Sequence, residues 1–157
     1  MPQLFKIDDP EFFKTGPASI EWVRVGTEAT GSVMANFPMG DDPDDPEVPI
    51  ASVLFLPPGH TLPRHAHDCY RVEVVIRGEL TVGDTILHSG DVSVSKPGEA
   101  YGPHIAGPTG VLSVEIFSRA AGLLPGFEGE LDDEARHSME AFTAAVEAYT
   151  GSKPDLG

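Results

Sequence analysis

Two histidines, His65 and His67, stand one residue apart just before a run rich in valine and isoleucine. On an extended strand, side chains at positions i and i+2 point to the same side, about 7 Å apart along the chain. Both imidazoles can then bind one divalent cation, because imidazole nitrogen is a common metal ligand. The pair alone is a weak signal, since Pro63, Arg64 and Asp68 flank it and such residues are common in loops that carry surface histidines.

Arg71 and Glu73 follow the histidines and face the same way if this segment is a strand. The planar guanidinium of Arg71 is suited either to clamp a substrate carboxylate or enolate, or to pair with Glu73. Glu73 is correspondingly either a metal ligand or the partner of Arg71 or Arg77. A buried arginine without a partner is costly, so one of these roles must hold if Arg71 points inward.

Tyr101 and His104 lie at the end of a second candidate segment, GDVSVSKPGEAYGPHI (90–105). The phenol of Tyr101 is either a metal ligand, a hydrogen-bond donor or acid toward substrate, or a buried aromatic with one partner for its hydroxyl. His104 comes three residues later, so a regular strand would turn it away from Tyr101. A bulge at Gly102 and Pro103 would turn it back into the cavity. His104 is therefore either a ligand or a rim histidine bonded to a loop carbonyl.

The elements around these residues are short. Seventeen glycines and fifteen prolines divide the chain into pieces of strand length. Eight pieces are rich in β-branched or aromatic residues: 19–25, 32–37, 50–56, 71–77, 80–83, 85–87, 91–95 and 110–118. Eight short strands at close spacing predict an all-β fold, an antiparallel sandwich or barrel.

The C-terminal stretch changes to a helical period. Apolar residues recur every three or four positions from Leu131 to Tyr149, after an acidic start and before Gly151. This pattern predicts one amphipathic helix over about 130–150, which covers a face of the β-structure or forms a subunit contact. The acidic, proline-rich segment 40–49 predicts an exposed loop.

Length and charge limit the classes of function. A chain of 157 residues predicts a single domain, 1–157, with one core. A net charge of -15 argues against nucleic acid and anionic membranes as partners, because both need positive patches. Cys69 is the only cysteine, and neither a leader-like start nor an apolar run long enough to span a bilayer is found. We therefore expect a reducing, cytoplasmic location.

The spacing of glycines and histidines resembles the two motifs of the cupin superfamily. Four residues match the spacing of the first motif: Gly59, His65, His67 and Gly78. Arg71 stands where the family has its glutamate ligand. Gly90 and Gly98 match the second motif, with Tyr101 at the position of its histidine. The resemblance covers about residues 50–118.

This resemblance implies an antiparallel jelly-roll barrel over 50–118, with Gly78 and Gly90 at tight turns. It also implies a divalent metal held by three histidines and one glutamate. Arg71 cannot replace that glutamate, because its guanidinium stays protonated. The candidate metal ligands are His65, His67, Glu73 and His104.

Cupins with one metal are often dioxygenases, so the resemblance implies Fe²⁺, or else Zn²⁺, Ni²⁺ or Mn²⁺, and a small diketone, enol or phenol as substrate. In that role Arg71 orients an anionic substrate and Tyr101 donates a hydrogen bond. Two alternatives stay open: a metal-free or structural-metal cupin that only binds a small ligand, and a metal-free isomerase of the sugar-epimerase kind. We expect no macromolecular partner except a second copy, in a homodimer.

Overall fold

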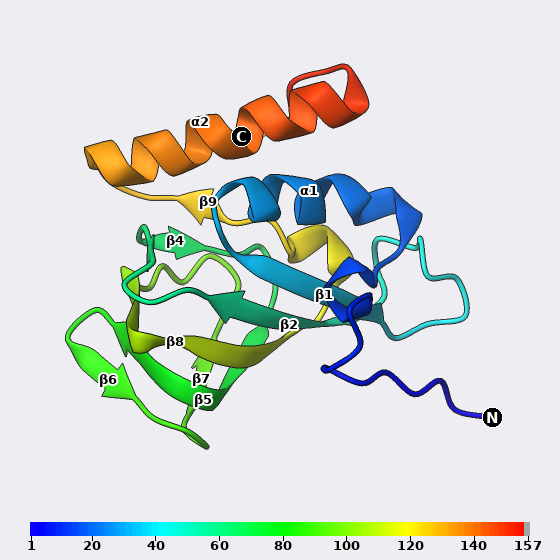
Figure 1. The fold of residues 1–157 in the computed structure, drawn as a ribbon, viewed down its shortest axis with the longest axis horizontal. Coiled ribbons are helices and arrows are strands. Elements are labelled where there is room, and N and C mark those ends of the chain that lie inside the picture. The colour runs from blue at the N-terminus through cyan, green and yellow to red at the C-terminus, as the bar shows by residue number, and fades with distance from the viewer. Residues whose placement is uncertain (156–157) are drawn as a thin grey trace.

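The computed structural model describes residues 1–155 as antiparallel β-structure with helices on one side (Figure 1). The larger sheet has seven strands: β1 (Val33–Pro38), β2 (Ile50–Leu56), β3 (Thr61–Leu62), β5 (Arg71–Val82), β6 (Thr85–Leu87), β7 (Val92–Ser95) and β8 (His104–Phe117). Its order is β1-β2-β8-β5-β6, with β3 beside β8 and β7 beside β5. Two short strands form a second sheet: β4 (His65–Ala66) and β9 (Gly126–Phe127). All of these pairings are antiparallel, as predicted.

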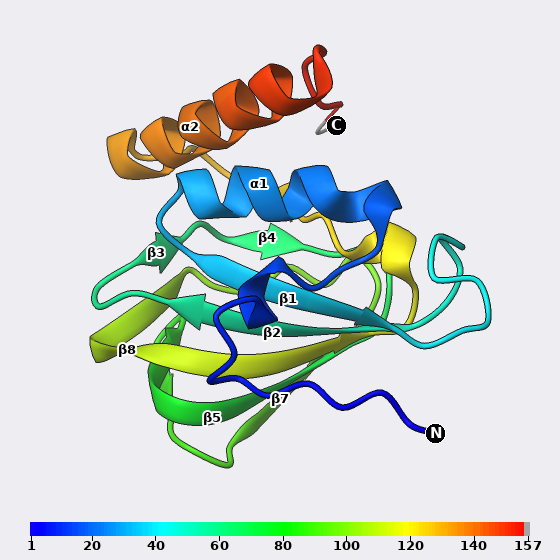
Figure 2. The same cartoon turned by 45° about the vertical axis from the view of Figure 1, so that its right-hand side comes forward.

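Two α-helices, α1 (Glu21–Ala29) and α2 (Asp133–Thr150), lie on the same side of the strands, with α2 outermost (Figures 1 and 2). They touch closely, since a Cβ added at Gly26 would lie 2.5 Å from the ring of Phe142. Three short 3-10 helices connect other parts of the chain: η1 (Phe12–Lys14), η2 (Ala18–Ile20) and η3 (Ala120–Gly122).

The helix predicted near the C-terminus is confirmed as α2. The side chain of Asp132 accepts a hydrogen bond from the Ala135 amide and caps the first turn. Gly151 ends the helix in the left-handed conformation, at φ 81°, which glycine adopts without steric cost. Within residues 1–155, no helix is both long and apolar enough to cross a bilayer.

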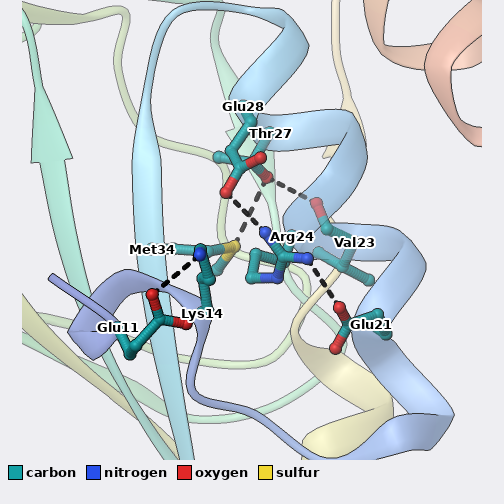
Figure 3. Close-up of polar contacts among 8 residues, drawn as sticks. All are labelled: Glu11, Lys14, Glu21, Val23, Arg24, Thr27, Glu28 and Met34. Carbon is teal, nitrogen blue, oxygen red and sulfur yellow. Dashed lines mark hydrogen bonds and ion pairs between the residues drawn. The ribbon is translucent and has the colours of Figure 1, made fainter.

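The strand predicted over 19–25 is wrong, because this segment folds as η2 and α1. Its β-branched and aromatic residues are typical of strands, but its charges have helical spacing. Arg24 pairs with Glu21 on one side and Glu28 on the other (Figure 3), three and four residues away. Burial of one face against the strands and α2 decides the outcome, so the fold has a helix that the sequence analysis did not predict.

Gly78 does not lie at a tight turn, which corrects a second expectation. The stretches predicted as separate strands over 71–77 and 80–83 form one strand, β5, and Gly78 is inside it with φ 85°. The pairing of β5 with β8 shifts register on both sides of this glycine. The backbone of Gly110 passes so close that no side chain fits there. Gly90 does lie in a turn, between β6 and β7, with φ 93°.

The strands bury apolar side chains on their inner face, and burial alternates along β2 and the first half of β5. Large members of the core are Ile50, Leu56, Val75, Leu80, Val111 and Phe117. On β5, however, the first two inward positions are Arg71 and Glu73, both 1% exposed. The interior is therefore polar at this end of the sheet. The acidic segment 40–49 forms the expected connection between β1 and β2 and is mostly exposed.

We predict that Gly78→Ala lowers the free energy of unfolding far more than Gly90→Ala. Both positions have positive φ, which costs an alanine about 1 kcal/mol. At Gly78 the new Cβ would also lie 2.1 Å from the Gly110 carbonyl oxygen, whereas nothing lies within 4 Å at Gly90. We expect a loss of about 3 kcal/mol or more at Gly78, measured by urea unfolding. Equal losses at the two sites would contradict the close approach of β5 and β8.

Candidate active site

A cavity of about 170 Å³ lies between the inner face of the strands and the two α-helices. Most of its wall is apolar and comes from several elements, including Met34, Leu54, Leu56, Leu123 and Phe142. Polar side chains in the wall include His65, His67, Arg71, His104 and Glu115. This volume suits an organic molecule of on the order of ten non-hydrogen atoms, since one water needs about 10–15 Å³ on the same measure. Four of the residues singled out from sequence therefore share one cavity.

The imidazoles of His65 and His67 lie side by side, with ring centroids 5.3 Å apart. Nδ1–H of His65 donates to the carbonyl of Pro63 at 2.6 Å, and Nδ1–H of His67 donates to the carbonyl of Gly122 at 2.8 Å. A carbonyl oxygen only accepts, so Nδ1 of each ring carries the hydrogen and Nε2 has the lone pair. Burial lowers the pKa of His65 to about 4 and also lowers that of His67. Both rings are therefore neutral at pH 7, with Nε2 available as an acceptor or ligand.

His104 is the first residue of β8 and is buried beside them, with its ring centroid 5.4 Å from that of His65. Gly102, at φ 103°, takes the chain out of strand geometry just before it. Nε2 of His104 is buried without a hydrogen-bond partner and lies 4.0 Å from a carboxylate oxygen of Glu73. Burial and the nearby Arg71 hold the pKa of His104 well below its ordinary value. His104 is thus a third neutral imidazole at this end of the cavity.

Arg71 is held by two carboxylates from neighbouring strands. Its Nε donates to Glu115 at 2.7 Å, and its Nη2 donates to Glu73. Glu73 and Glu115 are direct partners in the pairing of β5 with β8, so the register brings them to one place. The structure therefore shows the ion pair between Arg71 and Glu73 that the sequence left as one alternative. Glu73 lies 4.0 Å from His104 but is engaged by the arginine.

Glu115 is a site residue that the sequence analysis missed. It lies on β8 among residues that read as an ordinary apolar strand. Its inward facing follows from alternation with Ser113 and Phe117, which are both buried. A buried position for a lone glutamate in such a strand was the signal available from sequence, because an inward carboxylate needs a cationic partner.

The three charged groups shift one another's pKa values. Burial alone would lower the pKa of Arg71, but Glu115 and Glu73 outweigh it and keep the guanidinium protonated. Burial, together with the nearby Glu115, raises the pKa of Glu73. Burial would also raise the pKa of Glu115, but Arg71 outweighs it and holds that pKa below its ordinary value. The cluster thus contains a firm Arg71–Glu115 ion pair and a second carboxylate, Glu73, that is more easily protonated.

Tyr101 completes the cluster from the segment before β8. Its backbone pairs with His65, and the guanidinium carbon of Arg71 lies 4.6 Å from the centre of its ring. Its ring is also 5.1 Å from that of His104. Burial raises the pKa of the phenol, so the hydroxyl keeps its proton and can donate a hydrogen bond. No hydrogen-bond partner for this hydroxyl is found within residues 1–155.

Three buried polar atoms in this cluster have no partner among the described residues: Arg71 Nη1, Tyr101 Oη and His104 Nε2. Folded proteins satisfy the great majority of such groups with protein or ordered water. Leaving a donor or acceptor buried and unpaired costs about 1–3 kcal/mol. Three such atoms on neighbouring side chains therefore indicate that a group from outside the chain belongs beside this cluster.

His60 also lines this cavity, although no role was predicted for it from the sequence. Its Nε2 lies 3.2 Å from the hydroxyl of Ser32, which is 2% exposed. Leu62 pairs with His104, so His60 lies about 7 Å further along the wall, two residues away on the same face. Burial lowers the pKa of His60. His60 and Ser32 thus form a second polar group in the wall of the cavity.

The imidazoles of the cluster are chemically suited to bind a divalent cation. Neutral imidazoles whose Nδ1–H groups are fixed by carbonyls are typical metal ligands, and His65 and His67 have this arrangement. Glu73 fits less well, because Arg71 competes for its oxygens. In the part of the chain that the structure describes, no three His, Cys, Asp or Glu side chains yet surround a common point closely enough to hold an ion. A bound metal would therefore draw the three rings closer together.

We predict that Arg71→Gln destabilises the fold by about 3–5 kcal/mol at neutral pH, because it leaves two buried carboxylates unpaired. Without the arginine, both carboxyls have raised pKa values in the folded state, so that state binds protons that the unfolded chain releases. The loss should therefore grow as pH rises and shrink toward pH 4.5, the ordinary pKa of glutamate. Urea unfolding at several pH values measures this.

The control for Arg71→Gln is the triple variant with Glu73→Gln and Glu115→Gln added. It removes all three charges and should recover much of the lost stability and most of the pH dependence. A small loss that is independent of pH, or a triple variant no better than the single one, would show that the ion pairs do not hold this interior together.

No protein-family model matches the sequence, and no curated protein does either. Solved structures do resemble the fold. The polyketide cyclase RemF from Streptomyces resistomycificus matches with a TM-score of 0.57 and 13% identity, over 93% of this chain and 98% of that one. An RmlC-like cupin from Shewanella frigidimarina NCIMB 400 matches with a TM-score of 0.48 and 22% identity, over 56% of this chain and 76% of that one. Another RmlC-like cupin, from Ralstonia eutropha JMP134, matches with a TM-score of 0.47 and 20% identity, over 80% of this chain and 81% of that one. The chain therefore shares the fold of RemF along nearly its whole length, and RmlC-like cupins are among the solved structures that it resembles in part.

Proposed function

We propose that this chain is a metal-dependent enzyme that acts on a small enolisable compound: a diketone, enol or phenol. One observation carries the proposal: Arg71 and His104, which line a largely apolar cavity, and Tyr101, which lies against both, have buried polar atoms without a partner. A carbonyl or enolate oxygen satisfies two of these atoms at once, because Arg71 Nη1 and Tyr101 Oη are both donors. The apolar wall accommodates the carbon skeleton.

The residues of the cluster would favour the enolate over the neutral ketone. The buried guanidinium of Arg71 stabilises developing negative charge more strongly here than in water, because the surrounding dielectric is low. Tyr101 keeps its proton and donates to the same oxygen. Glu73 and Glu115 fix the guanidinium in place, so little reorganisation is needed when charge develops.

His65, His67 and His104 would hold the divalent cation, with Fe²⁺ as the first expectation. When bound, such an ion supplies a Lewis acid for a carbonyl oxygen and, in the case of iron, access to reactions with O₂. Glu73 remains a proposed ligand only if Arg71 releases it.

Polar groups elsewhere in the cavity wall limit the class of substrate further. His60 and Ser32 supply a second polar group about 7 Å along the wall from the level of His104. A compound with oxygen functions at both ends and an apolar middle therefore matches the cavity better than a simple ketone. A nucleotide sugar exceeds the size that this volume suits.

Two reactions of an enolate fit these features. Dioxygenation is the reaction that the motif resemblance implies. Cyclisation by attack of the enolate on a carbonyl of the same molecule is the second candidate, favoured by the likeness to a polyketide cyclase along nearly the whole chain. Both begin from the same bound enolate, and only the first consumes O₂.

We predict that substitution of each proposed imidazole ligand weakens metal binding by at least about 10-fold. Apo-protein is titrated with Fe²⁺ without oxygen, and with Zn²⁺, by calorimetry, for the variants His65→Ala, His67→Ala and His104→Ala. His137→Ala, in an exposed position on α2, is the matched control and should bind like the wild type. If the three variants retained wild-type affinity for the metal, the imidazoles would not be ligands. That result would favour the alternative of a protein that only binds a small ligand.

Turnover is tested with Fe²⁺-loaded protein and a panel of 1,3-diketones and hydroxylated single-ring aromatics, followed by mass spectrometry and an oxygen electrode. We expect conversion of at least one compound, reduced about 100-fold or more by Tyr101→Phe, which removes only the donor hydroxyl. Conversion that consumes O₂ supports dioxygenation, and equal conversion without O₂ supports cyclisation. Binding without any conversion would contradict an enzyme and favour a ligand-binding protein.

A further inference from the structure

The cavity that holds the proposed site gives solvent little access to its polar side chains. These side chains are at most 8% exposed: His65 and His67 are 5%, Arg71 1%, His104 2% and Glu115 8%. Water barely touches them, so a molecule of the size that the cavity suits reaches them only when part of the wall moves. The question is which part of the wall moves at the lowest cost.

The strands and α1 are both firmly held. On the strand side, β2 pairs with β8 along its whole length, so parting them would break a ladder of hydrogen bonds. Helix α1 packs against β1 and is joined to it by residues 30–32 alone. Its Val23 is part of the main hydrophobic core. Neither of these walls moves without loss of core packing.

Helix α2 is held more loosely than the rest of the wall. It is the outermost element in Figures 1 and 2 and packs mainly against α1. Only two of its eighteen residues are buried, Ala135 and Val146, and neither belongs to the main core. Yet α2 contributes Ser138, Met139 and Phe142, as well as Ala135, to the cavity wall. It is therefore the wall element that costs least to displace.

The connection that precedes α2 has the features of a hinge. The amide of Glu128 donates to the carbonyl of Arg64 and ties down the end of β9. No hydrogen bond from residues 129–131 is found in the part of the chain that the structure describes. Gly129 has φ 82°, with nothing within 4 Å of the position of a Cβ. Rotation about these three residues swings α2 without breaking a bond of the connection.

We infer that α2 is a lid on the cavity, which swings about residues 129–131 to admit a ligand. It closes by placing the ring of Phe142 against Gly26 of α1. The lack of a side chain at Gly26 permits this closure, because a Cβ there would lie 2.5 Å from the ring. Once closed, Met139 and Phe142 complete the apolar wall and keep water from the site. The inference rests on the proposed function only for what enters the cavity.

Access to the cavity is measured with iodoacetamide, so the test needs neither metal nor substrate. Leu54→Cys places a thiol in the cavity wall, and Val75→Cys places one in the core away from the cavity. Leu54 is 8% exposed and Val75 0%. The first thiol should react at least about 10-fold faster, because only the second requires the strands to unfold. Reaction at the buried Cys69, located by mass spectrometry in the wild type, gives the background.

Gly26→Leu should hold the lid open, because the new side chain occupies the space of the Phe142 ring. In this background we expect the thiol of Leu54→Cys to react about 10-fold faster, and that of Val75→Cys to be unaffected. Adding Phe142→Ala makes room for the leucine and should reverse most of the acceleration. Ala29→Leu, which adds the same bulk at an exposed position of α1, is the matched control and should change neither rate.

Hydrogen exchange of the wild-type chain tests the lid without any substitution. Amides of α2 should exchange at least about 10-fold faster than those of β5 and β8, because a helix of this length is only marginally stable in water once it leaves α1. Equal exchange, equal reaction of the two thiols, or equal acceleration by Ala29→Leu and Gly26→Leu would each overturn the inference. Absence of metal binding or turnover would contradict the proposed function and leave the lid standing.

Discussion

The burial of Arg71 is the constraint on which this interior depends. A guanidinium cannot lose its charge at any working pH, and an isolated charge inside a protein is very costly. Arg71 is 1% exposed, so the fold has to bring carboxylates to it. The register of β5 with β8 does this by placing Glu73 opposite Glu115, with alternation turning both inward. Beyond the two register shifts in this strand pair, His104 pairs with Val82 and lies in the wall of the cavity.

This arrangement also explains why the cluster invites a ligand. The two carboxylates engage Nε and Nη2 of the guanidinium and leave Nη1 unpartnered beside Tyr101. In the metal-binding motif that the sequence resembles, a glutamate occupies the position of Arg71. Here a fixed positive charge stands there instead, which favours an anionic oxygen and makes Glu73 a weaker candidate ligand than the imidazoles. In the proposed site, this difference would add an anion-binding group beside the imidazoles proposed to hold a cation.

Several features of the site could be predicted from sequence because they depend on local spacing. The pair His65 and His67, the shared facing of Arg71 and Glu73, and a departure from strand geometry at Gly102 all follow from periodicity and from glycine. Alternation indicates that Glu115 faces inward, but its partner could not be predicted, because that depends on which strand lies beside β5. Gly78 was misplaced for the same reason, since its requirement for glycine comes from the distant backbone of Gly110. Segment 19–25 has strand-like composition, and its helix is decided by packing against α2.

The unpartnered atoms of Arg71, Tyr101 and His104 define the proposed binding site for a group from outside the chain. A high-resolution crystal structure of protein purified without chelators would show whether such a group is present. We expect ordered density for an ion, a ligand oxygen or bound water within hydrogen-bonding or coordination distance of Arg71 Nη1, Tyr101 Oη and His104 Nε2. A structure in which these three atoms bond to one another or to other protein groups, with no space left between them, would contradict it.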